Sequence, residues 1–178
     1  MKIGDGSKLL IVCLYVDDLI FTRNDGAMFN KFKNSIMKEF EMTNLGNMHY
    51  FLGLVVVQSN DAIFVCQKKY VRKIQNRFKM KDCNSTHTPV EFGLKLHKDE
   101  EGEKVDSMMY KQMVSSLMCL TAIGPDIMYA VRLISKDMEN PTIMHLLTIK
   151  RIIPYLQGTK DFGLFYKKDK QMILDYLH

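Results

Sequence analysis

Two adjacent acids between two short apolar runs constrain the fold of this chain more than any other feature. Residues 9–15 and 19–21 are rich in β-branched and large apolar side chains, and Val16, Asp17 and Asp18 separate them. Runs of this length and composition are typical of buried strands. An interruption of this length predicts a β-hairpin with carboxylates at its turn.

The next segments predict a helix and further strands. Phe29, Phe32, Ile36 and Phe40 recur at helical spacing after a turn signal at residues 24–26, with lysines between them. This spacing predicts an amphipathic helix. The run at 50–57 predicts a second strand, and residues 62–66 are expected to pair back on it as a hairpin.

From about residue 67 the period becomes helical and two stripes separate. The apolar stripe consists of Tyr70, Val71, Ile74 and Phe78. The basic stripe consists of Lys69, Arg72, Lys73 and Arg77. Taken alone, this pattern favours an ordinary solvated face on an amphipathic helix.

The remainder of the chain predicts a helical part. Residues 82–106 are rich in charge and contain Pro and Gly, which indicates an exposed connecting segment. Three helices are expected after it: one capped by Asp106 or Ser107, one opening at Pro125, and one that opens near Pro141 and ends at Gly158. Residues 161–166 predict the start of another strand.

Composition narrows the function classes. Of 178 residues, 47% are hydrophobic and 25% are charged, so we expect a packed core and no wholesale disorder. The formal charge of +5 permits a nucleic-acid partner without requiring one. The four cysteines contain no C-x-x-C pair, which favours reduced thiols over a zinc site or a disulfide framework. No signal peptide or membrane span is predicted, so we expect an intracellular protein.

The acid pair has two interpretations. Carboxylates at a hairpin tip suit Mg²⁺, which proteins hold through one or two carboxylates together with substrate phosphates. Two such ions can stabilise the attacking and leaving oxygens of phosphoryl transfer. The alternative is a plain turn, because Asp is common in turns.

Tyr15-Val16-Asp17-Asp18 resembles the Y-x-D-D motif of reverse transcriptases, in the strand–turn–strand setting that the motif requires. Further segments follow in the order of the copia-type family: Phe40-Glu41-Met42-Thr43-Asn44-Leu45-Gly46, Tyr50-Phe51-Leu52-Gly53, Gln67-Lys68-Lys69-Tyr70, Thr88-Pro89, Tyr110 with Val114, and Pro125-Asp126-Ile127-Met128-Tyr129-Ala130-Val131. The chain thus resembles the C-terminal palm and thumb of a copia-type (Pseudoviridae-like) LTR retrotransposon reverse transcriptase.

The resemblance implies an α+β fold: a palm remnant of β-hairpins and one helix, followed by a helical thumb. The implied domains are a partial palm at 1–66, a thumb-like region at 67–160 that includes the connecting segment, and a connection toward an RNase H domain at 161–178. The implied partner is an RNA or DNA template–primer duplex.

The resemblance also implies roles for individual residues. Asp17 and Asp18 would be catalytic carboxylates and ligands of a two-metal Mg²⁺ site, and Tyr15 and Val16 would lie near the primer terminus and the incoming nucleotide. The residues implied as the primer grip are Tyr50, Phe51, Leu52 and Gly53. The basic residues Lys69, Arg72, Lys73 and Arg77 become candidates for contacts with nucleic-acid phosphates.

Several positions depart from the family pattern. The remaining catalytic Asp is expected well upstream of the hairpin, so the two-metal site is incomplete and we expect no activity from the chain alone. Association with the remaining palm, the fingers or RNase H portions of a polyprotein is expected instead. Gly124 stands where the family has Arg. Pro154 falls inside a predicted helix, where an interior proline costs about 3 kcal/mol.

Three functions remain open at this point. The chain is a fragment of an RNA-directed DNA polymerase, a non-catalytic nucleic-acid-binding relic of a retroelement, or a small α+β interaction domain whose acid pair is structural. The ordered series of motifs disfavours the last of these.

Overall fold

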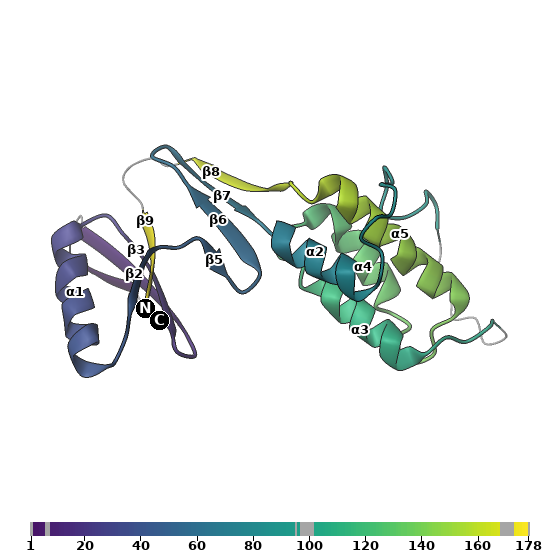
Figure 1. Ribbon diagram of the computed structural model, residues 1–178, viewed down its shortest axis with the longest axis horizontal. Coiled ribbons are helices and arrows are strands. Elements are labelled where there is room, and N and C mark those ends of the chain that lie inside the picture. The colour runs from purple at the N-terminus through teal and green to yellow at the C-terminus, as the bar shows by residue number, and fades with distance from the viewer. Residues whose placement is uncertain (1, 6–7, 95, 97–101, 168–172, 178) are drawn as a thin grey trace. The chain divides into compact units, whose positions relative to one another are not determined.

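The chain forms two compact units in a computed structural model that describes residues 2–5, 8–94, 96, 102–167 and 173–177. One unit comprises Met1–Val65 with Phe165–His178, and the other comprises Cys66–Leu164. The described residues form two antiparallel sheets, five α-helices and one short 3-10 helix (Figure 1). The predicted mixture of helices and strands is therefore confirmed.

The first sheet confirms the predicted hairpin. β2 (Lys8–Tyr15) and β3 (Asp18–Arg23) pair antiparallel from Leu10 opposite Arg23 to Tyr15 opposite Asp18. The other strands are β1 (Lys2–Asp5), β4 (Asn44–Asn47) and β9 (Ile173–Leu177), and the order is β1-β2-β3-β9-β4.

Helix α1 (Gly26–Glu39) covers one face of this sheet (Figure 1). The buried side chains of that face and of the helix are Leu10, Val12, Leu19, Phe21 and Phe29. The rings of Phe21 and Phe29 lie 4.8 Å apart, centroid to centroid. Alternate residues of a strand point to opposite faces, so this burial fixes the register of β2 and β3.

The end of the chain brings an element that the sequence did not indicate. The strand expected at 161–166 is confirmed as β8 (Gly163–Lys167). β9 then pairs antiparallel with both β3 and β4 and becomes an interior strand of the first sheet. No periodicity in the sequence predicted this long-range pairing.

The second sheet has the order β5-β6-β7-β8 and corrects one expectation. The single strand expected at 50–57 is two strands, β5 (Tyr50–Phe51) and β6 (Leu54–Gln58), joined by a tight turn. Leu52 and Gly53 both have positive φ, 46° and 87°, as in a type I′ hairpin turn. The continuous apolar run concealed this turn, because Leu rarely occupies such a conformation. β7 (Ala62–Cys66) follows β6 as the expected hairpin partner.

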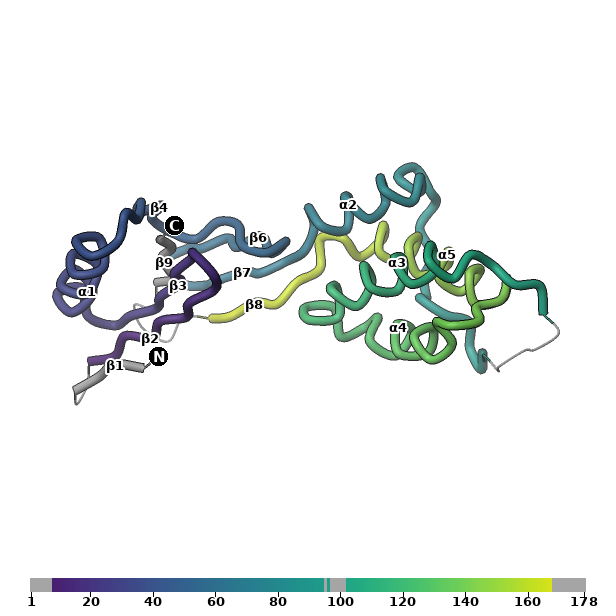
Figure 2. The backbone as a smooth tube through the Cα atoms, turned by 90° about the horizontal axis from the view of Figure 1, so that it is seen from below, coloured from purple at the N-terminus to yellow at the C-terminus, as the bar shows by residue number. Residues whose placement is uncertain are grey.

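The helices of the second unit are gathered together (Figure 2), and their buried side chains form one apolar core. The helices are α2 (Lys68–Arg77), α3 (Ser107–Met118), η1 (Pro125–Ile127), α4 (Met128–Ile134) and α5 (Ile143–Thr159). Tyr110 is fully buried and donates its hydroxyl proton to the carbonyl oxygen of Ile134 at 2.7 Å. Burial raises the pKa of Tyr110 above its usual range. This bond connects α3 to the end of α4.

Helix ends agree with the sequence in part. Asp106 is the N-cap of α3, as expected, and accepts from the backbone N–H groups of Met108 and Met109. The expected end of α5 at Gly158 is wrong by one residue, because the helix continues to Thr159. A Cβ atom at Gly158 would lie 3.2 Å from the Cβ of Ser85, so this glycine permits a close approach to residue 85. Residues 95 and 97–101 of the connecting segment at 82–106 lie outside the described residues.

Val16 carries backbone strain at the hairpin turn. Its φ is 52°, in the left-handed region that β-branched residues avoid. The side chain is 76% exposed, so core packing gives no compensation for the strain.

We expect Val16→Asn to raise the free energy of unfolding by about 1 kcal/mol, because Asn tolerates the left-handed conformation. Urea unfolding followed by circular dichroism measures the change. The matched control is Val57→Asn, an exposed valine in the extended conformation of β6. Loss of β-branching there should lower stability slightly. Equal changes in both variants would show that Val16 is not strained.

Pro154 lies inside α5, which nevertheless continues without interruption. Proline has no N–H for the helical bond to the carbonyl of Lys150. We expect Pro154→Ala to restore that bond and raise the free energy of unfolding by about 2 kcal/mol, somewhat below the full helix-propensity difference because some buried apolar area is lost. Urea unfolding measures this change.

Pro141→Ala is the control for that experiment. Pro141 precedes α5 and accepts at its carbonyl from the N–H of Val105 at 3.0 Å. Its substitution restores no helical bond, so no gain in stability is expected. A loss of stability in Pro154→Ala would mean that packing of the ring outweighs the missing bond.

Candidate functional site

The acid pair lies at the tip of the β2–β3 hairpin. Asp17 is in the turn and exposed, and Asp18 begins β3 and is half-buried. Asp18 lies opposite Tyr15 in the strand register. The structure therefore presents two carboxylates at a turn that two buried strands support.

The donor set at this tip fits part of a divalent-cation site. Among the described residues there is no group of three or more His, Cys, Asp or Glu side chains that could hold a metal ion. Asp17 and Asp18 thus supply at most two carboxylates. Mg²⁺ accepts such a set when phosphate oxygens and water complete its six oxygen ligands.

The hairpin tip contacts the β5–β6 hairpin through aromatic rings. The rings of Tyr15 and Phe51 meet edge to face, with centroids 5.8 Å apart and an interplanar angle of 85°. Phe51 also packs against the buried cluster of Met48, Val56 and Ile63. This contact brings two segments together that are 36 residues apart in sequence (51 minus 15). Tyr50 and Leu52 beside it are about half exposed, 48% and 57%.

A surface cleft of about 750 Å³ adjoins the tip on the side of α1. Val16 and Asp17 line it together with Leu14, Leu19, Ile36, Phe40, Glu41, Met42 and Thr43. Glu41 brings an exposed carboxylate to this cleft that sequence reasoning did not select. The only sequence feature that could have indicated Glu41 is its position directly after the amphipathic pattern of α1.

The basic stripe of the second unit is the solvent face of α2. The side chains of Lys69, Arg72, Lys73 and Arg77 are all exposed. Val71, Ile74 and Gln75 on the other side of the helix are buried. The predicted separation of basic and apolar faces is confirmed. These four cations belong to the second unit, whereas the acid pair and Tyr50 to Gly53 belong to the first.

A groove of about 510 Å³ lies beside this face, between α2 and α3. Arg77 and Lys111 supply its charges, and no Asp or Glu lines it. Arg77 donates to the Oε1 atom of Gln112 at 3.1 Å, and both residues line the groove. The remaining lining residues are Tyr70, Ser107, Met108, Ser115, Ser116 and Cys119. Lys111 was not selected from the sequence, because it is a single cation on a mainly apolar helix.

Two ionisable groups near α2 are perturbed by their surroundings. Burial raises the pKa of Tyr70 to about 12, and the neighbouring Cys119 thiol contributes. Asp161 pairs with Lys68, and the hydrogen bond from this lysine lowers the pKa of the Asp161 carboxyl. This ion pair ties Lys68 at the start of α2 to the segment that follows α5.

Within the described part of the chain, every helix is too short or too polar to cross a bilayer.

Comparisons with known proteins identify the family. The family model described as "Reverse transcriptase (RNA-dependent DNA polymerase)" matches residues 2–92. An uncharacterized mitochondrial protein of Arabidopsis thaliana is 32% identical over 92% of this chain and 68% of its own length. No solved structure gives a significant match.

Two transposon polyproteins give matches of similar strength. The retrovirus-related Pol polyprotein from transposon RE1 of Arabidopsis thaliana is 31% identical over 95% of this chain. The one from transposon TNT 1-94 of Nicotiana tabacum is 33% identical over 86%. The matched region is 12% of the length of each polyprotein. The chain belongs to the reverse transcriptase (RNA-dependent DNA polymerase) family and corresponds to part of the Pol polyprotein of a copia-type retrotransposon.

Proposed function

We propose that the β2–β3 hairpin tip is the carboxylate element of a polymerase centre that adds nucleotides to a primer. The observation that carries this proposal is the placement of Tyr15, Asp17 and Asp18 at one supported turn in a chain of this family. A metal-holding turn needs carboxylates that protrude from a rigid support, and the five-stranded sheet under α1 supplies one.

Asp17 and Asp18 would hold the divalent cation that reverse transcriptases generally use. The bound ion would neutralise charge on the transferring phosphoryl group. Asp17 is better placed than Asp18 to bridge to a substrate, because it is exposed in the turn whereas Asp18 is half-buried. The half-exposed side chain of Tyr15 and the exposed side chain of Val16 would lie against the primer terminus and the incoming nucleotide.

Tyr50, Phe51, Leu52 and Gly53 would act as the primer grip. The edge-to-face contact of Tyr15 with Phe51 supports this role, because it fixes the β5–β6 turn relative to the carboxylates. Phosphoryl transfer depends mainly on alignment of the reacting groups, so a fixed spacing between these two hairpins would matter for rate.

The exposed basic face of α2 would contact the phosphates of a template–primer duplex. The groove beside it supports this role, since it adds Lys111 and several hydroxyl groups and contains no acid. Such contacts bind without reading base sequence. In this proposal the second unit acts as the thumb and the first as part of the palm.

A second candidate function is nucleic-acid binding without chemistry. The observation that favours it concerns the metal ligands: the described residues supply two carboxylates at the tip but no group of three or more side chains that could hold a metal ion. We therefore infer that the chain alone binds a duplex and does not extend a primer.

The binding proposal predicts a salt-dependent affinity for an RNA–DNA duplex. Substitution of Arg72→Gln with Lys73→Gln should weaken binding and reduce the slope of log Kd against log salt concentration by about 2, because two phosphate contacts are lost. Fluorescence anisotropy of a labelled duplex over a salt series measures both quantities.

Lys136→Gln with Lys150→Gln is the matched control, since both lysines are exposed elsewhere in the second unit. This double variant carries the same change in net charge and should leave the slope nearly unchanged. An equal loss in the control would mean that binding depends on net charge alone. Failure of the parent chain to bind the duplex would refute the proposal.

The carboxylate proposal predicts weak binding of Mn²⁺ at the hairpin tip, visible as paramagnetic broadening of nearby resonances. Asp17→Asn with Asp18→Asn should abolish the broadening. Asp61→Asn, an exposed acid in the β6–β7 turn, should retain it.

Primer extension on an RNA template with Mg²⁺ complements that titration. We expect no extension by the parent or by the double variant. Extension by the parent and not by the double variant would show that two carboxylates suffice, and the inferred inactivity of the chain alone would be wrong.

A further inference from the structure

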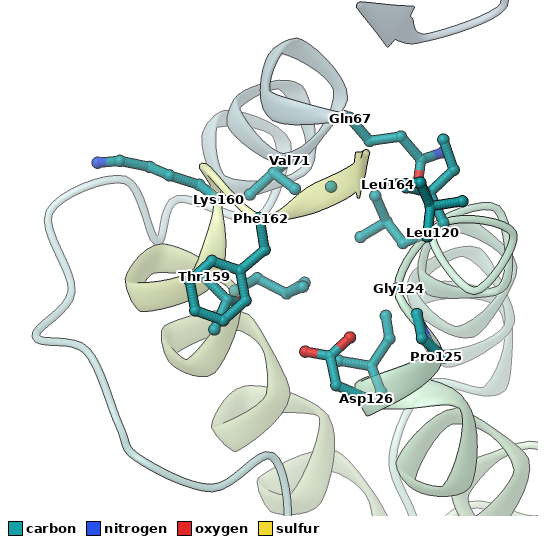
Figure 3. A pocket seen from close by; sticks show the side chains of 14 residues that line it. Gln67, Val71, Leu120, Gly124, Pro125, Asp126, Thr159, Lys160, Phe162 and Leu164 are labelled. Carbon is teal, nitrogen blue, oxygen red and sulfur yellow. The ribbon is translucent and has the colours of Figure 1, made fainter. Parts of the chain in front are cut away.

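A cavity of about 240 Å³ lies within the second unit, away from the basic face of α2 (Figure 3). The start of α2, the loop into η1, the end of α5 and residues 160–164 line it, and one side is open to solvent. Its walls are mainly apolar and include Val71, Leu120, Ile127, Leu156 and Leu164. None of the roles proposed above uses this cavity.

One carboxylate points into the cavity. Figure 3 shows the side chain of Asp126 directed toward its centre from η1. The Oδ2 atom of Asp126 accepts the hydroxyl proton of Tyr155 at 2.7 Å. Burial raises the pKa of Tyr155 to about 12, and this hydrogen bond contributes, so the hydroxyl remains a donor at physiological pH. Within the described residues no hydrogen bond to Oδ1 is formed, which leaves this oxygen as an acceptor for a ligand.

Gly124 keeps that oxygen accessible. A Cβ atom at residue 124 would lie 3.2 Å from Oδ1 of Asp126 and 3.4 Å from the side chain of Ile127, both of which line the cavity. A larger residue at this position would crowd the carboxylate. The glycine thus contributes to the opening in front of Asp126.

An aromatic ring and the local charge limit the chemical class of ligand that fits the cavity. Phe162 lines the cavity and is 67% exposed, so its ring is accessible beside the carboxylate (Figure 3). Lys160 also borders the cavity, but its side chain extends away from the centre in Figure 3. The exposed side of the cavity therefore carries a negative charge and an aromatic ring, and its walls are apolar.

We propose that this cavity binds a planar organic cation, an amidinium or guanidinium group carried on a compact apolar body. The cation would donate to Oδ1 of Asp126 and lie against the ring of Phe162, while the body fills the apolar space. Planar cations stack on aromatic rings and form directed hydrogen bonds to carboxylates better than ammonium groups do. A cavity of about 150 Å³ admits benzene, so a single ring fits in this space.

The test uses the full chain and four probes followed by ligand-observed NMR titration. The probes are benzamidine, benzylamine, benzoate and N-acetyl-arginine amide. Benzamidine should bind at least tenfold more tightly than benzoate, and more tightly than benzylamine. Asp126→Asn should weaken benzamidine binding tenfold or more. Asp82→Asn, an exposed acid of the same unit outside the cavity, should leave it unchanged.

A second variant keeps the proposal testable if Asp126→Asn does not fold. Phe162→Leu removes an exposed ring and leaves the core intact, and it should weaken benzamidine binding severalfold with an unchanged circular dichroism spectrum. Tighter binding of the arginine amide than of benzamidine would identify a peptide arginine as the source of the cation, and the reverse order would identify a free small molecule. Binding of benzoate as tight as that of benzamidine, or full binding by Asp126→Asn, would overturn the proposal. These outcomes do not depend on duplex binding or primer extension.

Discussion

The antiparallel pairing of β2 with β3 is the constraint on which the first unit depends. Leu10, Val12, Leu19 and Phe21 are buried against α1, and a slip of β3 by one residue along β2 would turn Leu19 and Phe21 to the opposite face of the sheet. The same register places Tyr15 opposite Asp18 and on the strand face away from α1, where its ring meets Phe51. A register selected by hydrophobic burial thus also sets the spacing between the carboxylates and the second hairpin.

The second unit depends on a different arrangement, in which helices converge on a fully buried Tyr110. Its hydroxyl donates a hydrogen bond to the carbonyl oxygen of Ile134, the last residue of the short helix α4. A carbonyl at a helix end lacks the backbone N–H that a following turn would supply. The apolar stripe of α2 packs against this core through Val71 and Ile74. Because that stripe is buried, the basic residues on the opposite side of α2 face the solvent.

Apolar spacing and capping residues predicted the secondary structure correctly where the structure depends on neighbouring residues in the sequence. The hairpin, α1, the two faces of α2 and the Asp106 cap all follow from apolar period or capping chemistry within a few residues. The type I′ turn at Leu52 escaped prediction because an apolar residue occupies a position usually taken by Asn or Gly. β9 escaped it because pairing across about 150 residues leaves no local pattern. The cavity at Asp126 required four separate segments to converge, which no spacing in the sequence encodes.

The strained backbone at Val16 bears on how the tip is used. A two-residue hairpin turn is formed with least strain by Gly, Asn or Asp, yet a β-branched residue stands at its first position with positive φ. Packing does not explain the choice, because the Val16 side chain is 76% exposed. It lies instead beside Asp17 at the cleft next to the carboxylates. Strain of this kind persists where a side chain is needed for contact with a ligand, so the position supports the proposed role of Val16 at the primer terminus.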